Sequence, residues 1–421
     1  MSERALRAGW AEIDLDAIQH NVRALRGVLV PPAQLMVVVK ANAYGHGAVE
    51  VARAAAAAGA WGFGVATADE GEELRRAGRR EPVVLLDLTL PDEAGRIVAN
   101  DLAVGVADLD AARALSRAAE ESGRAARLHL KIDTGMGRAG CSAADAPSLA
   151  AAVARLPGVA LEGCYTHFPA ADDRDLAPTR EQTAAFAGVV ASLREAGLAR
   201  EGGSRLRRAG QGGGLLCHAA NSAATLALPE AHFDLVRCGI AVYGIAPAPH
   251  LGGRVPLRPA MRLCARVVQA KRVAAGTTVG YGREYRAPRE TTIATVPLGY
   301  ADGYPRLAWP SAAVALAGRR VPLAGRISMD QLTVDAGEIQ IRKGDEVELW
   351  GPALPVEEVA AAAQTIPWEL LVRVAARVPR VFTSGGAARS VRTLVAAWDA
   401  SAAASEGRGR RARRLSGRAG R

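Results

Sequence analysis

Aromatic residues are scarce in this chain, at 4% of its 421 residues. Because 49% of the residues are nevertheless hydrophobic, the core must be built mainly from alanine, valine and leucine. No apolar run approaches the roughly 20 residues needed to cross a membrane. The start, Met1-Ser-Glu-Arg, continues without the apolar segment of a signal peptide. We therefore expect neither a membrane partner nor an export signal.

Cysteine is also sparse, and its spacing excludes two classes of protein. The five cysteines are odd in number and form no C-x-x-C pair and no metal-like cluster. This number and spacing of cysteines is typical of a protein in a reduced compartment rather than of a secreted domain held together by disulfides. We expect a cytoplasmic protein without a metal site.

Acidic residues are missing from the C-terminal end, where positions 407–421 hold seven arginines. Since the whole chain carries a net charge of +10, the remainder carries only 10 − 7 = +3. A second basic run spans Arg200 to Arg208. The excess charge thus lies in segments that we expect to be disordered, and a nucleic-acid partner is not expected.

Eight short apolar runs alternate with alanine-rich helical stretches in the first part of the chain. This alternation is the sequence form of a (β/α)8 TIM-type barrel, an α/β fold. An open doubly wound sheet is the alternative, but the glycine fingerprint expected after its first strand is absent. The expected strands are Gln34–Lys40, Trp61–Ala66, Val83–Leu88, Ala103–Ala107, Arg127–Asp133, Val159–His167, Leu215–Ala220 and Leu235–Tyr243.

After about Arg258 the pattern changes to short strands with few helices. We predict a barrel over residues 1–257, a mainly β domain over 258–390 and a basic tail over 391–421. The first strand, around Trp10, is compatible with either domain. The glycine-rich stretch Gly202–Gly214 is expected to be a surface insertion. The expected elements of the β domain are strands at Arg262–Val273, Thr291–Leu298, Ala313–Leu316 and Glu346–Trp350 and helices at Val356–Gln364 and Trp368–Arg377.

Polar residues fall where the expected barrel strands end, at the rim where barrel enzymes build their active sites. They are Lys40, Lys131, Asp133, His167, Asn221, Ser222 and Arg237. Lys40 follows three consecutive valines, so its amine is expected to emerge, partly desolvated, inside the barrel mouth. An amine held there suits imine formation with an aldehyde. A lysine after a strand is more often an ordinary solvated charge.

An ordered set of motifs resembles the bacterial alanine racemases, over roughly residues 8 to 390. The motifs are Val39-Lys40-Ala-Asn-Ala-Tyr44-Gly-His-Gly, Lys131-Ile-Asp-Thr-Gly-Met-Gly-Arg138, Tyr165-Thr-His167-Phe, His218-Ala-Ala-Asn221-Ser222-Ala, Val236-Arg237-Cys-Gly239-Ile240, Gly280-Tyr281-Gly, Gly299-Tyr300-Ala-Asp302-Gly-Tyr and Gly325-Arg326-Ile-Ser-Met329-Asp330-Gln. The resemblance implies a fold-type III enzyme with pyridoxal 5'-phosphate as cofactor. It also implies a homodimer with shared active sites that interconverts L- and D-alanine and supplies D-alanine for peptidoglycan.

Racemisation needs an electron sink and a base on each face of Cα. The resemblance implies that Lys40 forms the cofactor aldimine and serves one face, while Tyr281 of the other subunit serves the opposite face. His167 would orient Tyr281. Arg237 would bond the pyridine nitrogen, which stays unprotonated because arginine keeps its own protons. On the residues alone, Tyr281 would read as a tyrosine packed in a turn and His167 as a satisfied core histidine.

The remaining implied roles concern the phosphate and the substrate. Tyr44, Ser222, Gly239 and Ile240 match the phosphate site. Arg138, Met329 and Tyr300 match substrate-binding positions, with Arg138 also near the cofactor. Lys131 matches a lysine that is often carbamylated and that positions Arg138. Asp172, Arg306 and Arg326 resemble the charged residues of an access corridor.

One departure from the family stands out, because Ile366-Pro-Trp368-Glu369 holds tryptophan where a phosphate-binding tyrosine is usual. We therefore count Trp368 among the cofactor-binding positions with an altered contact. Two other readings stay open. A broad-specificity racemase shares the fold but tends to be exported, and a pyridoxal-phosphate carrier protein has only the barrel. A basic-amino-acid decarboxylase shares the architecture but not the Tyr281 and Arg237 motifs.

Overall fold

The computed structural model describes residues 7–198 and 215–393. Contacts divide the chain into two units: a barrel unit, Leu15–Ala260, and a β unit that combines the N-terminal strand with the chain from Met261 on. The barrel thus ends at Ala260 rather than at 257 and does not include the first strand. The predicted Gly202–Gly214 insertion and nearly all of the basic tail lie outside the described residues. Val391 and Arg392, expected in that tail, belong to a strand of the β unit.

The barrel unit contains one parallel sheet of nine strands, eight of which follow the order β10-β2-β3-β4-β5-β6-β8-β9, while the ninth pairs with β6. The two ends of this order, β9 and β10, are also linked to each other. The backbone N–H groups of Asp234 and Arg237 donate to the carbonyl oxygens of Cys217 and Ala220 at 3.0 and 2.9 Å. The predicted TIM-type barrel is confirmed. Its strands are β2 (Gln34–Val38), β3 (Gly62–Val65), β4 (Val83–Leu85), β5 (Ala103–Val106), β6 (Ala126–Asp133), β8 (Val159–Tyr165), β9 (Leu216–His218) and β10 (Leu235–Cys238), with β7 (Cys141–Ser142) beside β6.

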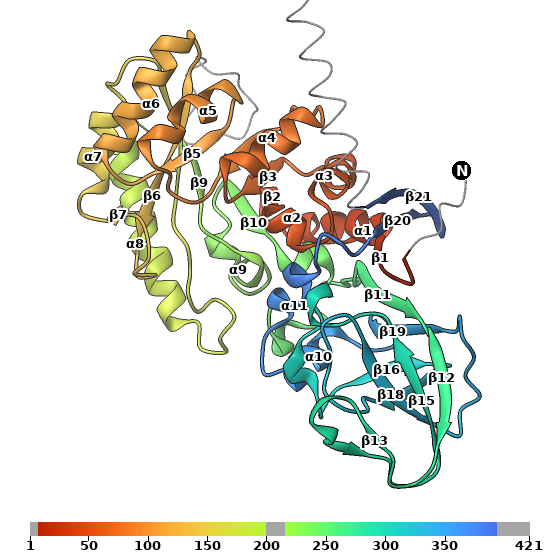
Figure 1. The fold of residues 1–421 in the computed structure, drawn as a ribbon. Coiled ribbons are helices and arrows are strands. Elements are labelled where there is room, and N and C mark those ends of the chain that lie inside the picture. The colour runs from red at the N-terminus through yellow and green to blue at the C-terminus, as the bar shows by residue number, and fades with distance from the viewer. Residues whose placement is uncertain (1–6, 199–214, 394–421) are drawn as a thin grey trace, which may run out of the picture. The chain divides into compact units, whose positions relative to one another are not determined.

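Helices follow the strands and cover them on the outside (Figure 1). Asp108 begins α6 by accepting the N–H of Ala111, and Gly123 ends it in the left-handed conformation. Valine, leucine and alanine side chains fill the space between helices and strands, as the shortage of aromatics requires. The helices are α1 (Leu15–Arg26), α2 (Lys40–Tyr44), α3 (Ala48–Ala57), α4 (Ala68–Arg76), α5 (Ala94–Ala99), α6 (Leu109–Ser122), α7 (Ala146–Val153), α8 (Ala177–Glu195) and α9 (Ser222–Ala227).

Several strand predictions in the barrel ran past the observed ends, including Val83–Leu88, which ends at Leu85, and Val159–His167, which ends at Tyr165. The two errors that matter most fall at the site. The first strand ends at Val38, and Lys40 begins the turn α2 instead of closing the strand. The last strand ends at Cys238, after which Ile240–Tyr243 form a 3-10 turn. In each case a run of apolar residues continues past the point where the backbone leaves the sheet, so hydrophobicity alone could not mark the end.

The β unit is a mainly β domain, as predicted. Its seven-stranded sheet has the order β17-β16-β19-β11-β1-β20-β21, its three-stranded sheet the order β12-β15-β18, and β13 and β14 form a small hairpin. The strands are β1 (Gly9–Asp14), β11 (Met261–Arg266), β12 (Gln269–Val273), β13 (Thr278–Val279), β14 (Tyr285–Arg286), β15 (Thr291–Val296), β16 (Ala313–Leu316), β17 (Arg319–Pro322), β18 (Leu332–Gly337), β19 (Glu346–Trp350), β20 (Arg380–Ser384) and β21 (Ala387–Arg392).

The predicted strand Arg262–Val273 was wrong as a single element. It divides into β11 and β12, which belong to different sheets, because Val267 donates to Asp345 and Val268 to Thr295. Two helices, α10 (Val356–Ala362) and α11 (Pro367–Arg373), complete the unit. No helix within the described ranges is long and apolar enough to cross a membrane.

Candidate active site

Lys40 is held at the end of β2 by a turn of unusual handedness. The four residues after it, 41–44, all have φ between 51° and 55°. None is glycine, so each costs on the order of 1–2 kcal/mol in this conformation. The turn persists because Ala43 donates to Val39 at 2.7 Å and the Asn42 side chain accepts the N–H of Ala48 at 3.0 Å. Strain of this kind concentrates at functional sites.

A cluster of small donors surrounds the turn after β10. The N–H groups of Gly239 and Ala241 donate to the Ser222 hydroxyl at 3.0 and 3.4 Å. A Cβ on Gly239 would lie 2.5 Å from the Tyr44 hydroxyl, so only glycine lets these groups meet. Burial raises the pKa of Tyr44 to about 12, which keeps its hydroxyl a donor. The structure thus brings together Tyr44, Ser222, Gly239 and the neighbouring Ile240. That they bind a phosphate stays a prediction.

Arg237 is buried in the barrel and donates to four acceptors. Its guanidinium contacts Nδ1 of His218 at 3.0 Å and Nδ1 of His167 at 3.2 Å. It also donates to the carbonyl oxygens of Thr166 at 2.7 Å and Ala219 at 2.9 Å. Burial lowers the pKa of Arg237 to about 10, still well above neutrality. The ion pairs of the described residues do not include Arg237, so no carboxylate offsets its charge there.

The guanidinium fixes the protonation of three histidines. Arginine cannot accept a hydrogen bond, so Nδ1 of His218 and of His167 must be the acceptors. Each of these two rings therefore carries its proton on Nε2. The Nε2–H of His218 donates to Nδ1 of His129 at 2.9 Å. Burial, with the charge of Arg237, lowers the pKa of His167 to about 3 and that of His218 well below its usual value. Burial also lowers the pKa of His129 to about 3, so these rings are neutral at pH 7.

His129 and His218 received no role from the sequence. A signal was present for His129, which precedes Lys131 by two residues in β6 and so shares its face of the strand. His218 lies at the end of β9 and stacks on Tyr165 with ring centroids 4.8 Å apart. Only the order of the strands in the sheet reveals that these side chains meet.

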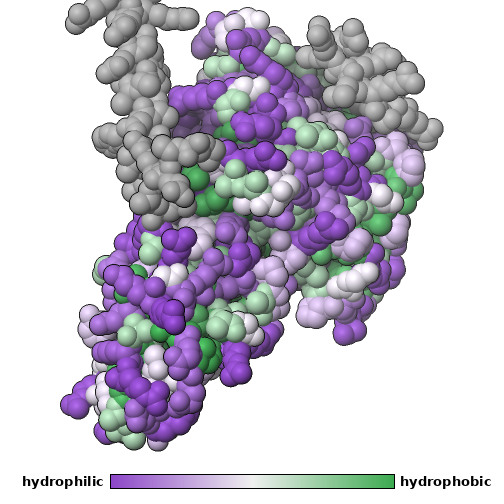
Figure 2. Space-filling model, turned by 90° about the vertical axis from the view of Figure 1, so that its right-hand side faces the viewer, coloured by the Kyte–Doolittle hydropathy of each residue, from purple (hydrophilic) through white to green (hydrophobic). Residues whose placement is uncertain are grey.

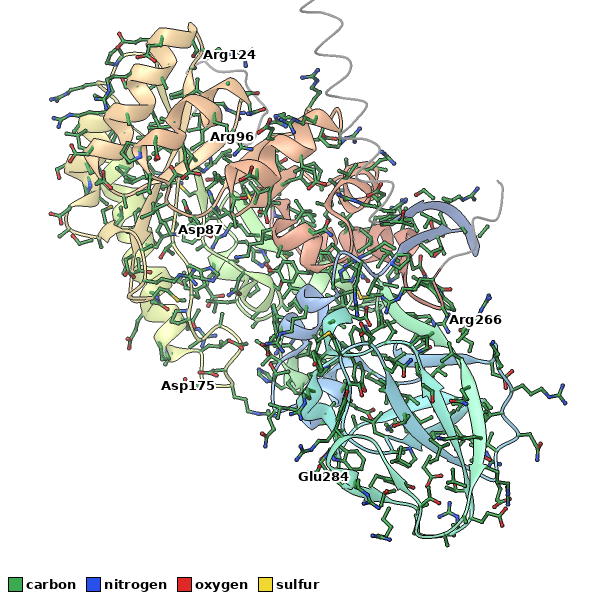
Figure 3. The ribbon with its side chains drawn as sticks, in the orientation of Figure 1. Asp87, Arg96, Arg124, Asp175, Arg266 and Glu284 are labelled. Carbon is green, nitrogen blue, oxygen red and sulfur yellow. The ribbon has the colours of Figure 1, made fainter. Side chains whose placement is uncertain are left out.

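Lys131 is buried beside Tyr165. Its amine donates to the carbonyl oxygen of Leu86 at 3.0 Å and lies 3.9 Å from the carboxylate of Asp87, which is labelled in Figure 3. The Tyr165 hydroxyl donates to the same carbonyl at 2.6 Å. Burial lowers the pKa of Lys131; Asp87 opposes this shift, and the charge of Arg138 adds to it.

Arg138 is exposed, on a turn that follows β6. Asp133 shapes this turn, since its carboxylate accepts N–H groups from residues 135, 136 and 137. Burial raises the pKa of Asp133, but these three donors outweigh that effect and the net shift is downward. The turn thus presents Arg138 at the end of the strand that carries Lys131.

The predicted site residues of the β unit are exposed. Tyr281 is 70% exposed between two glycines of positive φ, Gly280 and Gly282. Met329 is 53% and Tyr300 42% exposed. The loops that bear Tyr300 and Met329 are joined, because Tyr300 donates to Ser328 at 3.1 Å and Ala301 donates to Met329 at 3.0 Å.

A buried carboxylate organises these loops. Asp302 accepts from Arg7, from Arg377 at 2.7 Å and from the Gly299 N–H at 3.0 Å. Arg377 also reaches Asp330, next to Met329, at 2.6 Å. Burial opposes ionisation of Asp302, yet its donors hold its pKa below the usual value.

The residues expected to form an access corridor lie in different units. Asp172 belongs to the barrel unit and is exposed, whereas Arg306 and Arg326 belong to the β unit. Arg326 forms an ion pair with Glu284, labelled in Figure 3, which also accepts from the Trp309 indole at 3.4 Å. The corridor itself stays a prediction.

Trp368 is the second residue of α11 and is half-buried in the β unit. The phosphate donors described above belong to the barrel unit. The contact of Trp368 with the cofactor therefore stays a prediction.

The fold and this site define a barrel enzyme with a lysine at a strand end, a turn of compact polar groups around Ser222 and a buried arginine, followed by a β domain. The sequence profile of the alanine racemase N-terminal domain matches residues 13–247, and that of the C-terminal domain matches residues 260–382. The chain belongs to the alanine racemase family.

Several relatives resemble the chain along nearly its whole length. The alanine racemase of Desulforamulus reducens is 44% identical over 89% of this chain and 98% of its own, and that of Desulfovibrio desulfuricans is 42% identical over the same shares. The crystal structure of alanine racemase from Streptomyces lavendulae has 43% identity and a TM-score of 0.83, covering 91% of this chain and 98% of its own. That of Bacillus anthracis, with bound L-Ala-P, has 33% identity and a TM-score of 0.84, covering 92% and 98%.

Proposed function

We propose that this protein is a pyridoxal-phosphate-dependent alanine racemase that interconverts L- and D-alanine and supplies D-alanine for peptidoglycan. The observation that carries the proposal is the arrangement in one barrel of Lys40, the donors around Ser222 and the buried cation of Arg237. Relatives named alanine racemase, 42–44% identical over most of the chain, support the substrate. The five free cysteines support a reduced, cytoplasmic compartment.

The residues of the barrel fit the cofactor. Its phosphate needs compact donors, and Ser222, Gly239 and Tyr44 supply a hydroxyl, an N–H and a second hydroxyl that lie within contact of one another. Arg237 keeps its protons, so it suits an acceptor such as an unprotonated ring nitrogen. When bound, pyridoxal phosphate withdraws electrons from the Cα of an attached amino acid, which makes the Cα proton removable.

The two bases would come from different units. Lys40 holds and releases the proton on one face, and Tyr281 does so on the other. Tyr281 needs a donor that stabilises its phenolate, and His167 fits because its proton is on Nε2. Arg237 maintains that tautomer, so it serves both the ring nitrogen and, through His167, the opposite base.

A homodimer would give the exposed residues of the β unit a partner. The backbones of its loops approach one another closely at two glycines. A Cβ added to Gly280 would lie 3.4 Å from the backbone of Arg326, and a Cβ added to Gly299 would collide with the backbone of Ser328 and Met329. The loops that carry Tyr281, Tyr300 and Met329 are thus neighbours. Exposed apolar groups gathered in this way are typical of an interaction surface. We propose that this surface completes the site of a second copy, with the Met329 N–H and Arg138 binding the substrate carboxylate.

Carbamylation of Lys131 would add a negative partner for Arg138. The reaction requires a neutral amine, and burial lowers the pKa of Lys131 in that direction. A carbonyl carbon signal from protein equilibrated with ¹³C-labelled bicarbonate, absent in Lys131→Ala, would support this part of the proposal. Its absence from both proteins would refute it.

The experiment that tests the function is chiral chromatography after separate incubation with L-alanine, L-serine and L-lysine. We expect rapid formation of D-alanine and far slower turnover of the other two, and none by Lys40→Ala. Comparable rates with all three would favour a broad-specificity racemase instead. A wild-type protein that binds the cofactor but racemises nothing would favour a carrier.

A further inference from the structure

The carboxylate of Glu70 lies where two segments of the barrel rim meet. Its Oε1 accepts the N–H of Ala41, the residue after Lys40, at 2.6 Å. Its Oε2 accepts the N–H of Ala66 at 2.8 Å and that of Thr67 at 3.4 Å, directly after the neighbouring strand β3. One side chain therefore ties the turn after Lys40 to the end of the next strand.

Helix capping explains only part of this arrangement. Thr67 begins α4, and its hydroxyl accepts the N–H of Glu70 at 3.3 Å, which completes a capping box. A capping glutamate reaches back to the N-cap N–H, here Thr67. That contact is the longest of the three, whereas the shortest goes to Ala41, outside the helix altogether.

The position of this contact gives it consequences for Lys40. The N–H of Ala41 belongs to the peptide that joins Ala41 to Lys40, so its direction sets the orientation of that peptide plane. The residues after it are in the left-handed conformation, which the chain adopts only where its surroundings enforce it. Asn42 and Ala43 hold the far side of the turn, and Glu70 holds the side next to Lys40.

We propose that Glu70 is a positioning residue for Lys40. Glu70 fixes the backbone next to Lys40, so that the amine of Lys40 can reach the aldehyde of the cofactor. The inference rests on the proposed function. It concerns the attachment of the cofactor and not the acid or base chemistry, because Glu70 acts on a backbone N–H.

Three variants separate positioning from capping. Glu70→Ala removes the acceptors of both Ala41 and Ala66. Glu70→Gln keeps the shape but only one acceptor oxygen, and its amide NH2 cannot accept from the second N–H. Thr67→Ala is the matched control, since it weakens the same helix end and leaves the Ala41 contact in place.

The purified holoprotein is treated with borohydride, and the fraction of chains labelled at Lys40 is measured by peptide mapping. Cofactor loss on dialysis, kcat and KM for alanine, and the melting temperature are measured alongside. We expect Glu70→Ala to lose cofactor at least about tenfold faster than Thr67→Ala at a similar melting temperature, with a lower labelled fraction and a lower kcat but little change in KM. Glu70→Gln should fall between them.

Equal labelling and cofactor loss in Glu70→Ala and Thr67→Ala would overturn the inference alone. If Glu70→Ala does not fold, Glu70→Gln decides: labelling below that of Thr67→Ala supports the inference, and equal labelling overturns it. A wild-type protein that is not labelled at Lys40 at all would overturn the proposed function, and the inference with it.

Discussion

The barrel unit and the β unit carry their site residues in opposite ways. In the barrel, Arg237, Lys131 and Ser222 are buried and each has fixed hydrogen-bond partners. In the β unit, Tyr281 and Met329 project into solvent from loops that are themselves firmly held. The face shown in Figure 2 is mainly hydrophilic, with hydrophobic patches between the polar residues. The polar groups of the barrel are therefore fixed in position before any ligand binds, whereas Tyr281 and Met329 of the β unit remain exposed in the single chain.

Replacing the central group of the barrel should have the largest effect. Lys40→Ala should abolish racemisation and the covalent attachment of the cofactor, because in the proposed function this amine forms the link and serves one face of Cα. Visible absorbance and borohydride labelling measure the attachment. Retained label elsewhere on the chain would show that another amine is used.

Replacing the exposed tyrosine should remove catalysis without harming the fold. Tyr281→Phe should slow racemisation by about 10²–10⁴-fold, the usual contribution of a positioned acid or base. Since the side chain is exposed, the melting temperature should hardly change. Isotope effects with Cα-deuterated L- and D-alanine should then differ from each other. Near-wild-type rates in both directions would remove Tyr281 from the mechanism.

The loops of the β unit should depend on their buried carboxylate. Asp302→Asn leaves Arg7 and Arg377 with a weaker partner and should cost about 1.5–3 kcal/mol of stability. KM for alanine should rise, because the loop that carries Met329 loosens. The control is Arg320→Ala, which breaks an exposed ion pair with Glu358 in the same unit and should cost less than about 1 kcal/mol. Similar losses from both variants would show that Asp302 has no special role.

The histidines of the barrel predict a pH dependence of stability. His129 and His167 have a pKa of about 3 in the fold, against about 6.5 when unfolded. The unfolded chain binds more protons between these values, so stability should fall as the pH drops from 6.5 toward 3, by up to about 1.4 kcal/mol per pH unit for each ring.

Urea unfolding at several pH values between 6.5 and 5 measures this slope. His129→Asn keeps an acceptor for His218 while removing one titrating group, so its slope should be shallower. Identical slopes in the variant and the wild type would contradict the assignment of His129 as a neutral, buried ring.

The smallest effect concerns Trp368, which stands where the motif of the family predicts a tyrosine. Trp368→Tyr should slow cofactor loss on dialysis by up to about tenfold if a new hydroxyl reaches the phosphate. Trp368→Phe should change it little. If Phe strips the cofactor and Tyr gains nothing, the indole N–H is itself the phosphate ligand.

Much of the barrel and its site could be predicted because their signals are local. Apolar runs indicated the eight strands, and polar residues at their ends indicated Lys40, Ser222 and Arg237. The left-handed turn could not be predicted, because Ala-Asn-Ala-Tyr carries no glycine that would favour it. The histidine chain was also missed, since it depends on strands β6 and β9 being brought together around β8.

The β unit was harder to predict for a related reason. The sequence gives no break between β11 and β12, since Val267 and Val268 continue the apolar pattern across the change of sheet. The contribution of Tyr281 was assigned by resemblance alone. The structure adds only that Tyr281 is exposed, which is compatible with the proposed action in a second chain.

Mixing two inactive variants tests the shared site most directly. Lys40→Ala and Tyr281→Phe chains are combined under conditions that exchange subunits, and alanine racemisation is measured. If each site takes Lys40 from one chain and Tyr281 from its partner, every mixed dimer of a two-fold symmetric pair regains one intact site, and random exchange restores about one quarter of wild-type activity. If both bases come from the same chain, no intact site can form and the mixture stays inactive.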